Sequence, residues 1–210
     1  MSAHVYFPFD ERNPRPQFYP PVIEEINWSD IFENGKGPNS LDIGCGMGRF
    51  LLDFADENRS KNVLGLEVRR EPVDYIKTVI AGENLGNCTA IRYSLANGLP
   101  FINSESVEDI FYFFPDPWYK TRQQKRRVFS NSFLDECYRV LKKDAKLYIQ
   151  TDVEELHKYH IETLEAWEGR FSDIKISFKS KDGQWELHET DQEKIALRAD
   201  FEIHRIILTK

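Results

Sequence analysis

Three alternate glycines between an apolar segment and an amphipathic one restrict the fold of this chain more than any other feature. Residues 40–50 read Ser-Leu-Asp-Ile-Gly-Cys-Gly-Met-Gly-Arg-Phe, with the glycines at 44, 46 and 48. Glycine has no Cβ and tolerates positive φ, so the backbone of a strand-to-helix turn can approach a ligand closely there. We therefore expect a ligand site at the carboxyl end of a first parallel strand, with Gly44 and Gly46 in contact with the ligand.

Two acidic residues accompany this loop. Glu67 ends the next apolar segment, 19 residues after Gly48, where a carboxylate can accept both hydroxyls of an adenosine ribose. Asp42 lies inside the first strand, where an acid is costly unless it is paired, directed at a ligand, or solvated at the strand end. The dinucleotide fingerprint requires glycine at the position that Arg49 occupies, which disfavours a nicotinamide or flavin enzyme.

From residue 40 onward, short apolar segments alternate with longer amphipathic ones, which predicts a parallel sheet flanked by helices. The expected strands are 41–43, 63–67, 89–92, 109–114 and 146–150, and the expected helices are 50–55, 73–80, 128–141 and 156–167. After residue 170 two further strands, 174–178 and 201–208, have no long helix between them, so we expect an antiparallel pair at one edge. The pattern predicts a Rossmann-like α/β fold with a seven-stranded, mostly parallel sheet and helices on both faces, although it also allows a flavodoxin-like fold.

The length of 210 residues suits one domain. Five prolines within the first 21 residues predict an extended amino-terminal arm, and a short helix or turn is expected near Trp28. We therefore divide the chain into an arm and short helix at 1–38 and one domain at 39–210.

Composition excludes several classes of protein. No apolar run approaches the roughly 18 residues that a membrane span needs, and the first residues lack the pattern of a secretion signal. Three widely spaced cysteines fit a reducing compartment and offer no metal-ligand spacing. We expect a cytoplasmic protein without a membrane or metal partner; the sequence does not indicate whether a second protein subunit is required.

The segment from Phe113 to Trp118 reads Phe-Phe-Pro-Asp-Pro-Trp and follows a strongly apolar strand. Its two prolines cannot continue the ladder of hydrogen bonds, so the chain must turn and hold Asp116 in a rigid aromatic corner. If this strand is the fourth, it neighbours the first, and Asp116 faces the same crevice as the glycine loop. A proline-rich turn with a capping aspartate is the structural alternative.

The formal net charge of −7, from 28 basic and 35 acidic residues, argues at first against a nucleic-acid partner. The charges are distributed unevenly, however. Residues 119–127 contain five basic residues and no acid, which leaves 23 basic and 35 acidic residues elsewhere. Basic side chains beside aromatic ones suit phosphate contacts and base stacking, although a charged run is often only a solvated face. The basic residues of this tract are Lys120, Arg122, Lys125, Arg126 and Arg127.

Taken in order, these motifs resemble those of the tRNA (guanine-N7-)-methyltransferases, which are class I S-adenosylmethionine-dependent methyltransferases. The resemblance spans roughly residues 27–200, and the Phe-Pro-Asp-Pro-Trp box with its basic followers is its most specific part. It rests on the glycine loop, Leu66-Glu-Val-Arg, the Phe-Pro-Asp-Pro-Trp box, Lys125-Arg-Arg, Gln150-Thr-Asp and Thr190-Asp-Gln-Glu.

The resemblance implies a role for each motif. S-adenosylmethionine would be bound by Asp42, Gly44, Gly46, Glu67, Arg69 and, near the adenine, Ser94 or alternatively Asn97. Asp116 would be the acid of the catalytic centre. Lys120, Asp152, Thr190 and Glu193 would bind the tRNA guanosine, a guanine of the variable loop. From their clustering beside the candidate site, we expect Arg122, Lys125, Arg126 and Arg127 to contact tRNA phosphates.

Two other functions remain open on the sequence. A methyltransferase of another substrate would share the glycine loop and Glu67 but would give no reason for the basic tract. A non-catalytic RNA-binding subunit could retain the fold without binding the cofactor, and Ser94, in place of the usual acidic or amide residue, allows this.

Overall fold

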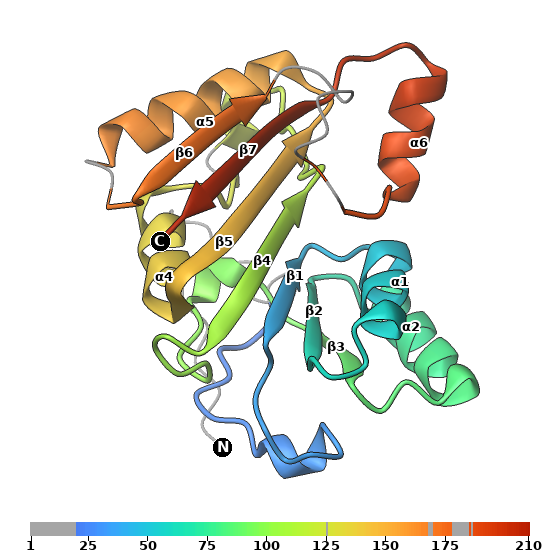
Figure 1. The fold of residues 1–210 in the computed structure, drawn as a ribbon. Helices are drawn as coiled ribbons and strands as arrows, with labels where there is room; N and C mark the ends of the chain where they lie inside the picture. The colour runs from blue at the N-terminus through green and yellow to red at the C-terminus, as the bar shows by residue number, and fades with distance from the viewer. Residues whose placement is uncertain (1–19, 125, 168–169, 178–184, 186) are drawn as a thin grey trace.

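The computed structural model describes residues 20–124, 126–167, 170–177, 185 and 187–210. Seven strands form one sheet in the order β3-β2-β1-β4-β5-β7-β6 (Figure 1). The first five are mutually parallel where they pair, and β7 pairs antiparallel with both β5 and β6. Their bounds are β1 Ser40–Ile43, β2 Val63–Glu67, β3 Cys88–Arg92, β4 Val107–Phe113, β5 Leu141–Thr151, β6 Asp173–Ser177 and β7 His204–Thr209.

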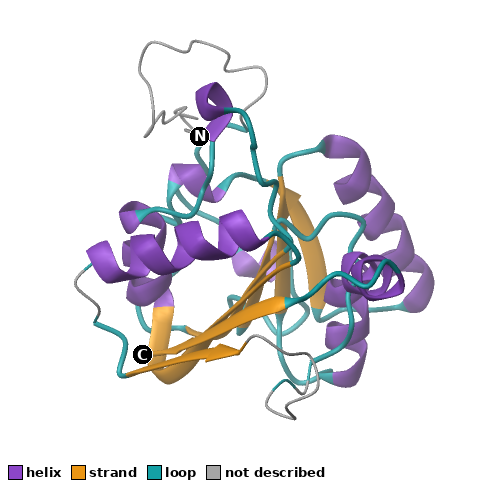
Figure 2. Ribbon diagram, turned by 90° about the horizontal axis from the view of Figure 1, so that it is seen from above, coloured by secondary structure: helices purple, strands orange, loops and turns teal. Residues whose placement is uncertain are grey.

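Helices cover both faces of this sheet (Figure 2). The α-helices are α1 Arg49–Glu57, α2 Arg70–Glu83, α3 Thr121–Gln124, α4 Asn131–Val140, α5 Glu154–Ala166 and α6 Asp191–Arg198, and two short 3₁₀ helices are η2 Trp28–Asp30 and η3 Leu95–Asn97. The fold class predicted from the sequence is confirmed: β4 neighbours β1, and the last two strands form the antiparallel edge.

Strand β4 separates two hydrophobic cores because its side chains alternate between the faces. Phe111 and Phe113 pack on the α1 and α2 side, with Phe50 and Ile76 among their cluster. Ile110 and Tyr112 point to the other face, where α4 and α5 bury aromatic and aliphatic side chains against them. Two covered faces leave the carboxyl edge of the parallel strands as the natural position for a ligand.

The boundary that differs most from expectation lies where a helix and a strand follow each other without a turn residue. Helix α4 ends at Val140 and β5 begins at Leu141, five residues before the expected start of that strand. Residues 141–146, between the actual and the expected start of the strand, contain neither glycine nor proline, the residues that usually mark such a boundary. The short helix α3, inside the basic tract, was not expected. The expected strand end at residue 178 lies outside the described residues.

The described part of the amino-terminal arm packs on the domain. Val22 and Phe32 are buried, and Phe32 belongs to the core cluster of the α4 and α5 face. The division into an arm at 1–38 and a domain at 39–210 stays a prediction, and residues 1–19 lie outside the described part.

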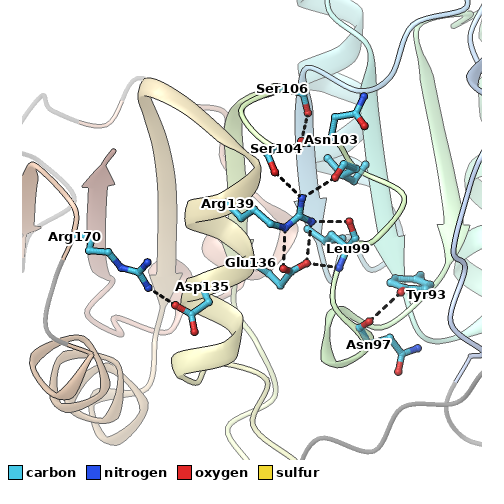
Figure 3. A network of polar contacts seen from close by, with 11 residues as sticks. Tyr93, Asn97, Leu99, Asn103, Ser104, Ser106, Asp135, Glu136, Arg139 and Arg170 are labelled. Atoms are coloured by element: carbon cyan, nitrogen blue, oxygen red, sulfur yellow. Dashed lines mark hydrogen bonds and ion pairs between the residues drawn. The ribbon is translucent and has the colours of Figure 1, made fainter.

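A polar network fixes the long connection between β3 and β4 (Figure 3). Glu136 of α4 accepts a hydrogen bond from the backbone N–H of Leu99 at 2.6 Å, and Arg139 donates to the carbonyls of Leu99 and Ile102 at 2.8 and 2.9 Å. Burial alone would raise the pKa of Glu136, but hydrogen bonds from Arg139 and the Leu99 N–H outweigh it, and the net shift lowers that pKa. The network therefore holds this connection, including η3, against α4.

Within the described residues, no helix combines the length and apolar character needed to cross a bilayer. The same residues contain no group of three or more His, Cys, Asp or Glu side chains suited to a metal ion.

Candidate active site

The glycine loop leaves an open space above its backbone. Gly44 and Gly46 have φ values of 78° and 54°, and a Cβ added at either would meet no atom within 4 Å. The N–H groups of Gly44 and Cys45 donate to the carbonyl of Leu66 at 2.7 and 3.2 Å, which fixes the turn. A small ligand can therefore lie directly against this backbone, as the residue pattern predicted.

The third glycine of the loop has a different task. A Cβ at Gly48 would lie 2.5 Å from Cγ1 of Ile76 on α2, and its φ is 80°. Gly48 therefore lets α1 start close to α2, whereas Gly44 and Gly46 face the open space.

Glu67 lies at the carboxyl end of β2, beside this space, and is buried. Its carboxylate accepts hydrogen bonds from the N–H of Gly46 at 3.0 Å and from the N–H and Nε of Arg69 at 2.9 and 3.1 Å. Glu67 thus connects the glycine loop to the start of α2. Its position suits the ribose hydroxyls of an adenosine, because the strand end and loop meet there.

Asp42 is buried within β1, at 3% exposure. Burial, and after it the nearby charge of Glu67, raise its pKa to about 7. The alternative of a solvated strand end is excluded by this burial. A positively charged ligand group is the partner that would best stabilise two neighbouring carboxylates here, and the sulfonium cofactor carries such a charge.

Asp116 is exposed on a strained loop after β4. The loop is bounded by two residues with left-handed backbone, Phe114 at φ 47° and Trp118 at φ 46°, and the Phe114 N–H donates to the carbonyl of Gln150 at 2.7 Å. Left-handed conformations of aromatic residues cost energy and concentrate at functional sites. The pKa of Arg69 is raised first by its hydrogen bond to Glu67 and also by the charge of Asp116. Asp116 and Glu67 therefore influence the same guanidinium.

The connection after β3 distinguishes the two residues considered for the adenine. Ser94 caps η3, and its Oγ accepts the N–H of Ala96 at 3.3 Å. Asn97 is buried and donates through Nδ2 to the carbonyl of Pro20 at 2.8 Å. Asn97 thus ties the amino-terminal segment to this connection, and Ser94 remains the better candidate for the cofactor.

The start of α6 completes the carboxyl edge of the sheet, at the same end as the arrowheads of β4 and β5 (Figure 1). Gln192 donates to Asp152, which directly follows β5, at 2.9 Å, and Arg49 at the start of α1 lies 4.0 Å from Asp191. The hydroxyl of Thr190 accepts the N–H of Glu193 and caps α6. The sequence motif around Thr190 is therefore brought beside Asp152.

Glu193 itself is buried in an ion pair with Arg205 of β7. The resemblance assigns Glu193 to the guanosine; in the structure, its Oε1 is held by Arg205 while its Oε2 has no partner among the described residues. Glu193 can still contribute an acceptor, from a position that the ion pair fixes.

The basic tract divides into exposed and structural residues. Lys120 and Arg122 are exposed, while Arg126 is half-buried and lies 5.1 Å from the ring of Trp118. Arg127 is 7% exposed, donates to the carbonyl of Pro117 at 2.9 and 3.0 Å, and pairs with Glu155 of α5 at 3.0 Å. We therefore withdraw Arg127 from the expected phosphate contacts, because its guanidinium is already used to hold the Pro-Asp-Pro loop. Lys125 lies outside the described residues.

Three further polar residues at this edge, Gln150, Trp185 and Arg205, had no predicted role. Gln150 is part of the Gln150-Thr-Asp motif, and its place in an apolar strand was a signal, because a buried amide must be paired.

Several solved structures with the same architecture are methyltransferases. The chain superimposes on the 16S rRNA methyltransferase KamB with a TM-score of 0.59 and 14% identity, over 86% of this chain and 89% of that one. It superimposes on a SAM-dependent methyltransferase from Aquifex aeolicus with a TM-score of 0.53 and 19% identity, over 83% and 82%. At these identities the likeness shows the fold, a Rossmann-like α/β sheet that these methyltransferases share.

The sequence comparisons define the family. A family model described as "Putative methyltransferase" matches residues 36–205. A tRNA (guanine-N(7)-)-methyltransferase of Prochlorococcus marinus (strain MIT 9515) is 29% identical over 192 residues, covering 85% of this chain and 88% of that protein. Its counterpart in Prochlorococcus marinus (strain AS9601) is 35% identical over 142 residues, which cover 65% of this chain and 68% of that protein. The counterpart in Scheffersomyces stipitis is 30% identical over 196 residues, which cover 79% of this chain and 65% of that protein. This chain belongs to the tRNA (guanine-N7-)-methyltransferase family.

Proposed function

We propose that this protein transfers a methyl group from S-adenosylmethionine to N7 of a guanine in tRNA, with the variable loop as the site of the target base. The observation that best supports this is the position of Asp116 on the strained loop after β4, the strand that pairs with β1, whose carboxyl end leads into the open backbone of Gly44 and Gly46. An acid for the base and an open backbone for the cofactor thus follow the carboxyl ends of two neighbouring strands.

The cofactor would be held by residues of β1, β2 and the connection after β3. The backbone at Gly44 and Gly46 is open to a ligand, and Glu67 has acceptors for the ribose hydroxyls. Asp42 adds a second buried carboxylate, within β1. Arg69 must release Glu67 for the ribose to bind both of its oxygens. S-adenosylmethionine supplies an electrophilic methyl group on a sulfonium, so the protein itself needs no nucleophile.

Guanine N7 carries an in-plane lone pair and no hydrogen, so its methylation removes no proton. A general base is therefore not required, and the protein accelerates the reaction by aligning the base and by placing negative potential where positive charge develops. Asp116 accepts the N–H donors of the guanine and supplies that potential. Asp152, beside the start of α6, shares this role, and Lys120 and Thr190 lie on the segments flanking the two acids.

The tRNA backbone would be held by the exposed part of the basic tract. Arg122 and Arg126 contact phosphates in this proposal, together with Lys125, and their proximity to Trp118 and Tyr119 adds surfaces on which bases can stack. Arg127 supports the loop from behind through Pro117.

The experiment that tests this proposal is incubation with labelled S-adenosylmethionine and unmodified tRNA, followed by chemical cleavage at N7-methylguanine to locate the product. We expect label in tRNA and one cleavage site. Label appearing only in a protein or a small molecule would support a methyltransferase of another substrate. Absence of cofactor binding by calorimetry would instead support the non-catalytic subunit.

The role of Asp116 is tested by Asp116→Ala and Asp116→Asn. Because the side chain is exposed, both variants should fold, and loss of a positioned charge-assisted acceptor should lower kcat/KM for tRNA by about 100-fold or more. Cofactor affinity, measured by calorimetry, should change little. A rate close to that of the wild type for Asp116→Ala would remove Asp116 from the mechanism.

A further inference from the structure

A buried amide without partners lies under the proposed base site. The side chain of Gln150, near the carboxyl end of β5, is fully buried, and neither its Oε1 nor its Nε2 has a hydrogen-bond partner among the described residues. Nearly all buried polar side chains are paired with protein, water or ligand. An unpaired amide two residues before Asp152 therefore indicates that something else binds there.

The register of the sheet places three neighbours around this amide. Gln150 is opposite Phe113 of β4 on one side and opposite Arg205 of β7 on the other, and Tyr148 precedes it by two residues on the same strand. Directly opposed residues, and residues two apart in a strand, share one face of a sheet. All four side chains therefore point to the face that carries α1.

Trp185 covers this group of side chains. The centre of its ring is 5.6 Å from that of Phe113 and 5.6 Å from that of Tyr148, and the guanidinium carbon of Arg205 is 5.0 Å from it. Contacts with all three neighbours place the indole over Gln150. The indole Nε1 and the Nε of Arg205 are also buried without a partner among the described residues. Three side chains of one group therefore carry unsatisfied N–H donors, and the indole of Trp185, itself a planar bicyclic ring, covers the group.

The chemistry of this group complements the one edge of guanine that Asp116 and Asp152 cannot bind. Carboxylates accept hydrogen bonds from N1–H and the 2-amino group, but the O6 carbonyl needs a donor. Adenine carries an amino group at this position, so a donor at C6 accepts guanine and rejects adenine. The unpaired Nε of Arg205 is a hydrogen-bond donor. The amide of Gln150 can rotate so that its Nε2 donor faces O6 and its oxygen points away from the base.

We propose that Gln150, with Arg205 beside it, binds O6 of the target guanine and selects guanine over adenine, in a pocket that Trp185 fills until the base displaces it. This inference rests on the proposed function. The pair of acids then holds one edge of the base, and the amide of β5 holds the other.

The experiment measures kcat/KM on tRNA with guanosine, 6-thioguanosine or inosine at the target position. Sulfur at C6 is a poor acceptor and leaves N1–H and the 2-amino group in place, whereas inosine keeps O6 and lacks only the 2-amino group. The variants are Gln150→Leu and the nearly isosteric Gln150→Glu, which replaces the donor by an acceptor. Gln124→Leu, at a half-buried position of α3, is the matched control.

We expect Gln150→Leu to lower kcat/KM about tenfold or more on guanosine and on inosine, because a buried hydrogen bond to O6 is lost. The wild type should methylate 6-thioguanosine more slowly than guanosine. On 6-thioguanosine, Gln150→Leu should change kcat/KM by less than about twofold, because the sulfur and the substitution remove the same contact. Gln150→Glu should behave like Gln150→Leu.

An equal penalty on all three bases, or none, would contradict the inference and leave Gln150 a structural residue. If the variants fail to fold in urea titrations, the wild type alone decides: equal rates on guanosine and 6-thioguanosine reject binding to O6. A wild type that methylates no tRNA would reject the proposed function itself, which is a different outcome from methylation without discrimination at C6.

Discussion

Three acidic side chains of the site experience different surroundings although they lie near one another. Asp42 is buried within a strand, Glu67 is buried but accepts three N–H donors, and Asp116 is exposed on a loop. Burial raises the pKa of Asp42. The three acids therefore present different surroundings to a ligand and can serve different parts of the reaction.

The raised pKa of Asp42 predicts a specific pH dependence of stability. Its folded pKa of about 7 exceeds the ordinary value of 3.8, so the folded state holds a proton that the unfolded chain releases. The stability due to this group is complete below about pH 4 and is lost as the pH rises to 7. Asp42→Asn removes this titration. The unfolding free energy of the variant, relative to that of the wild type, should therefore increase across this pH range, by up to about 4 kcal/mol.

Urea unfolding of both proteins from pH 4 to 8 measures this difference. Because S-adenosylmethionine is cationic, its affinity for the wild type should also rise as the pH passes 7, and its affinity for Asp42→Asn should not. A constant difference in stability between the two proteins across this range would show that Asp42 is ionised throughout.

Residue types alone identified Glu67 and Asp116 because each follows an apolar strand in a recognisable motif. They could not separate the functions of adjacent arginines. Arg122 and Arg127 are equivalent as sequence, yet the first is exposed and the second is buried against Pro117 and Glu155. Whether a basic side chain is free depends on which helix packs behind it, and that is a property of tertiary structure.

At the scale of elements, the connection between β3 and β4 depends on one helix for its conformation. Arg139 of α4 binds Glu136 and the carbonyls of Leu99 and Ile102, and the same connection contains Ser94 and η3 (Figure 3). Arg139→Met should keep the aliphatic packing but leave Glu136 and two carbonyls without their charged donor. We expect a loss of about 2–4 kcal/mol of unfolding free energy.

The double variant Arg139→Met with Glu136→Gln measures how much of this loss arises from the uncompensated acid, and it should recover part of the stability. Arg59→Met, at an exposed pair with Asp56, is the matched control and should cost less than about 1 kcal/mol. Equal losses at Arg139 and Arg59 would mean that the network does not stabilise the connection.

Some element boundaries followed from the sequence and others did not. The strand β2 has the bounds that its pattern predicted, whereas α4 begins at Asn131, three residues after the expected start, because Ser130 caps it through the N–H of Phe133. The early start of β5 could not be predicted, because Leu141 continues from α4 with no turn residue and its strand character comes from pairing with Val107. Pairing between distant segments, unlike local capping, leaves no local signal.

For the molecule as a whole, net charge is a poor guide to its partner. An excess of seven acidic charges coexists with a basic segment beside the candidate site, and Lys120 and Arg122 are exposed there. Acidic surface elsewhere disfavours nonspecific contact with RNA, so binding should depend on few phosphate contacts. The same domain must therefore hold the cofactor, the base and the tRNA backbone.

This arrangement predicts the salt dependence of tRNA binding. Each phosphate contact releases counterions, so Arg122→Gln and Arg126→Gln should each reduce the slope of log K against log salt by about 0.7–1. Binding should be measured by filter retention or anisotropy between low and physiological salt, with cofactor affinity followed in parallel and expected to stay constant. Lys77→Gln, at an exposed position of α2, provides the control with the same change in net charge. If Lys77→Gln lowers the slope as much as Arg122→Gln does, the effect comes from overall charge and the tract makes no phosphate contacts of its own.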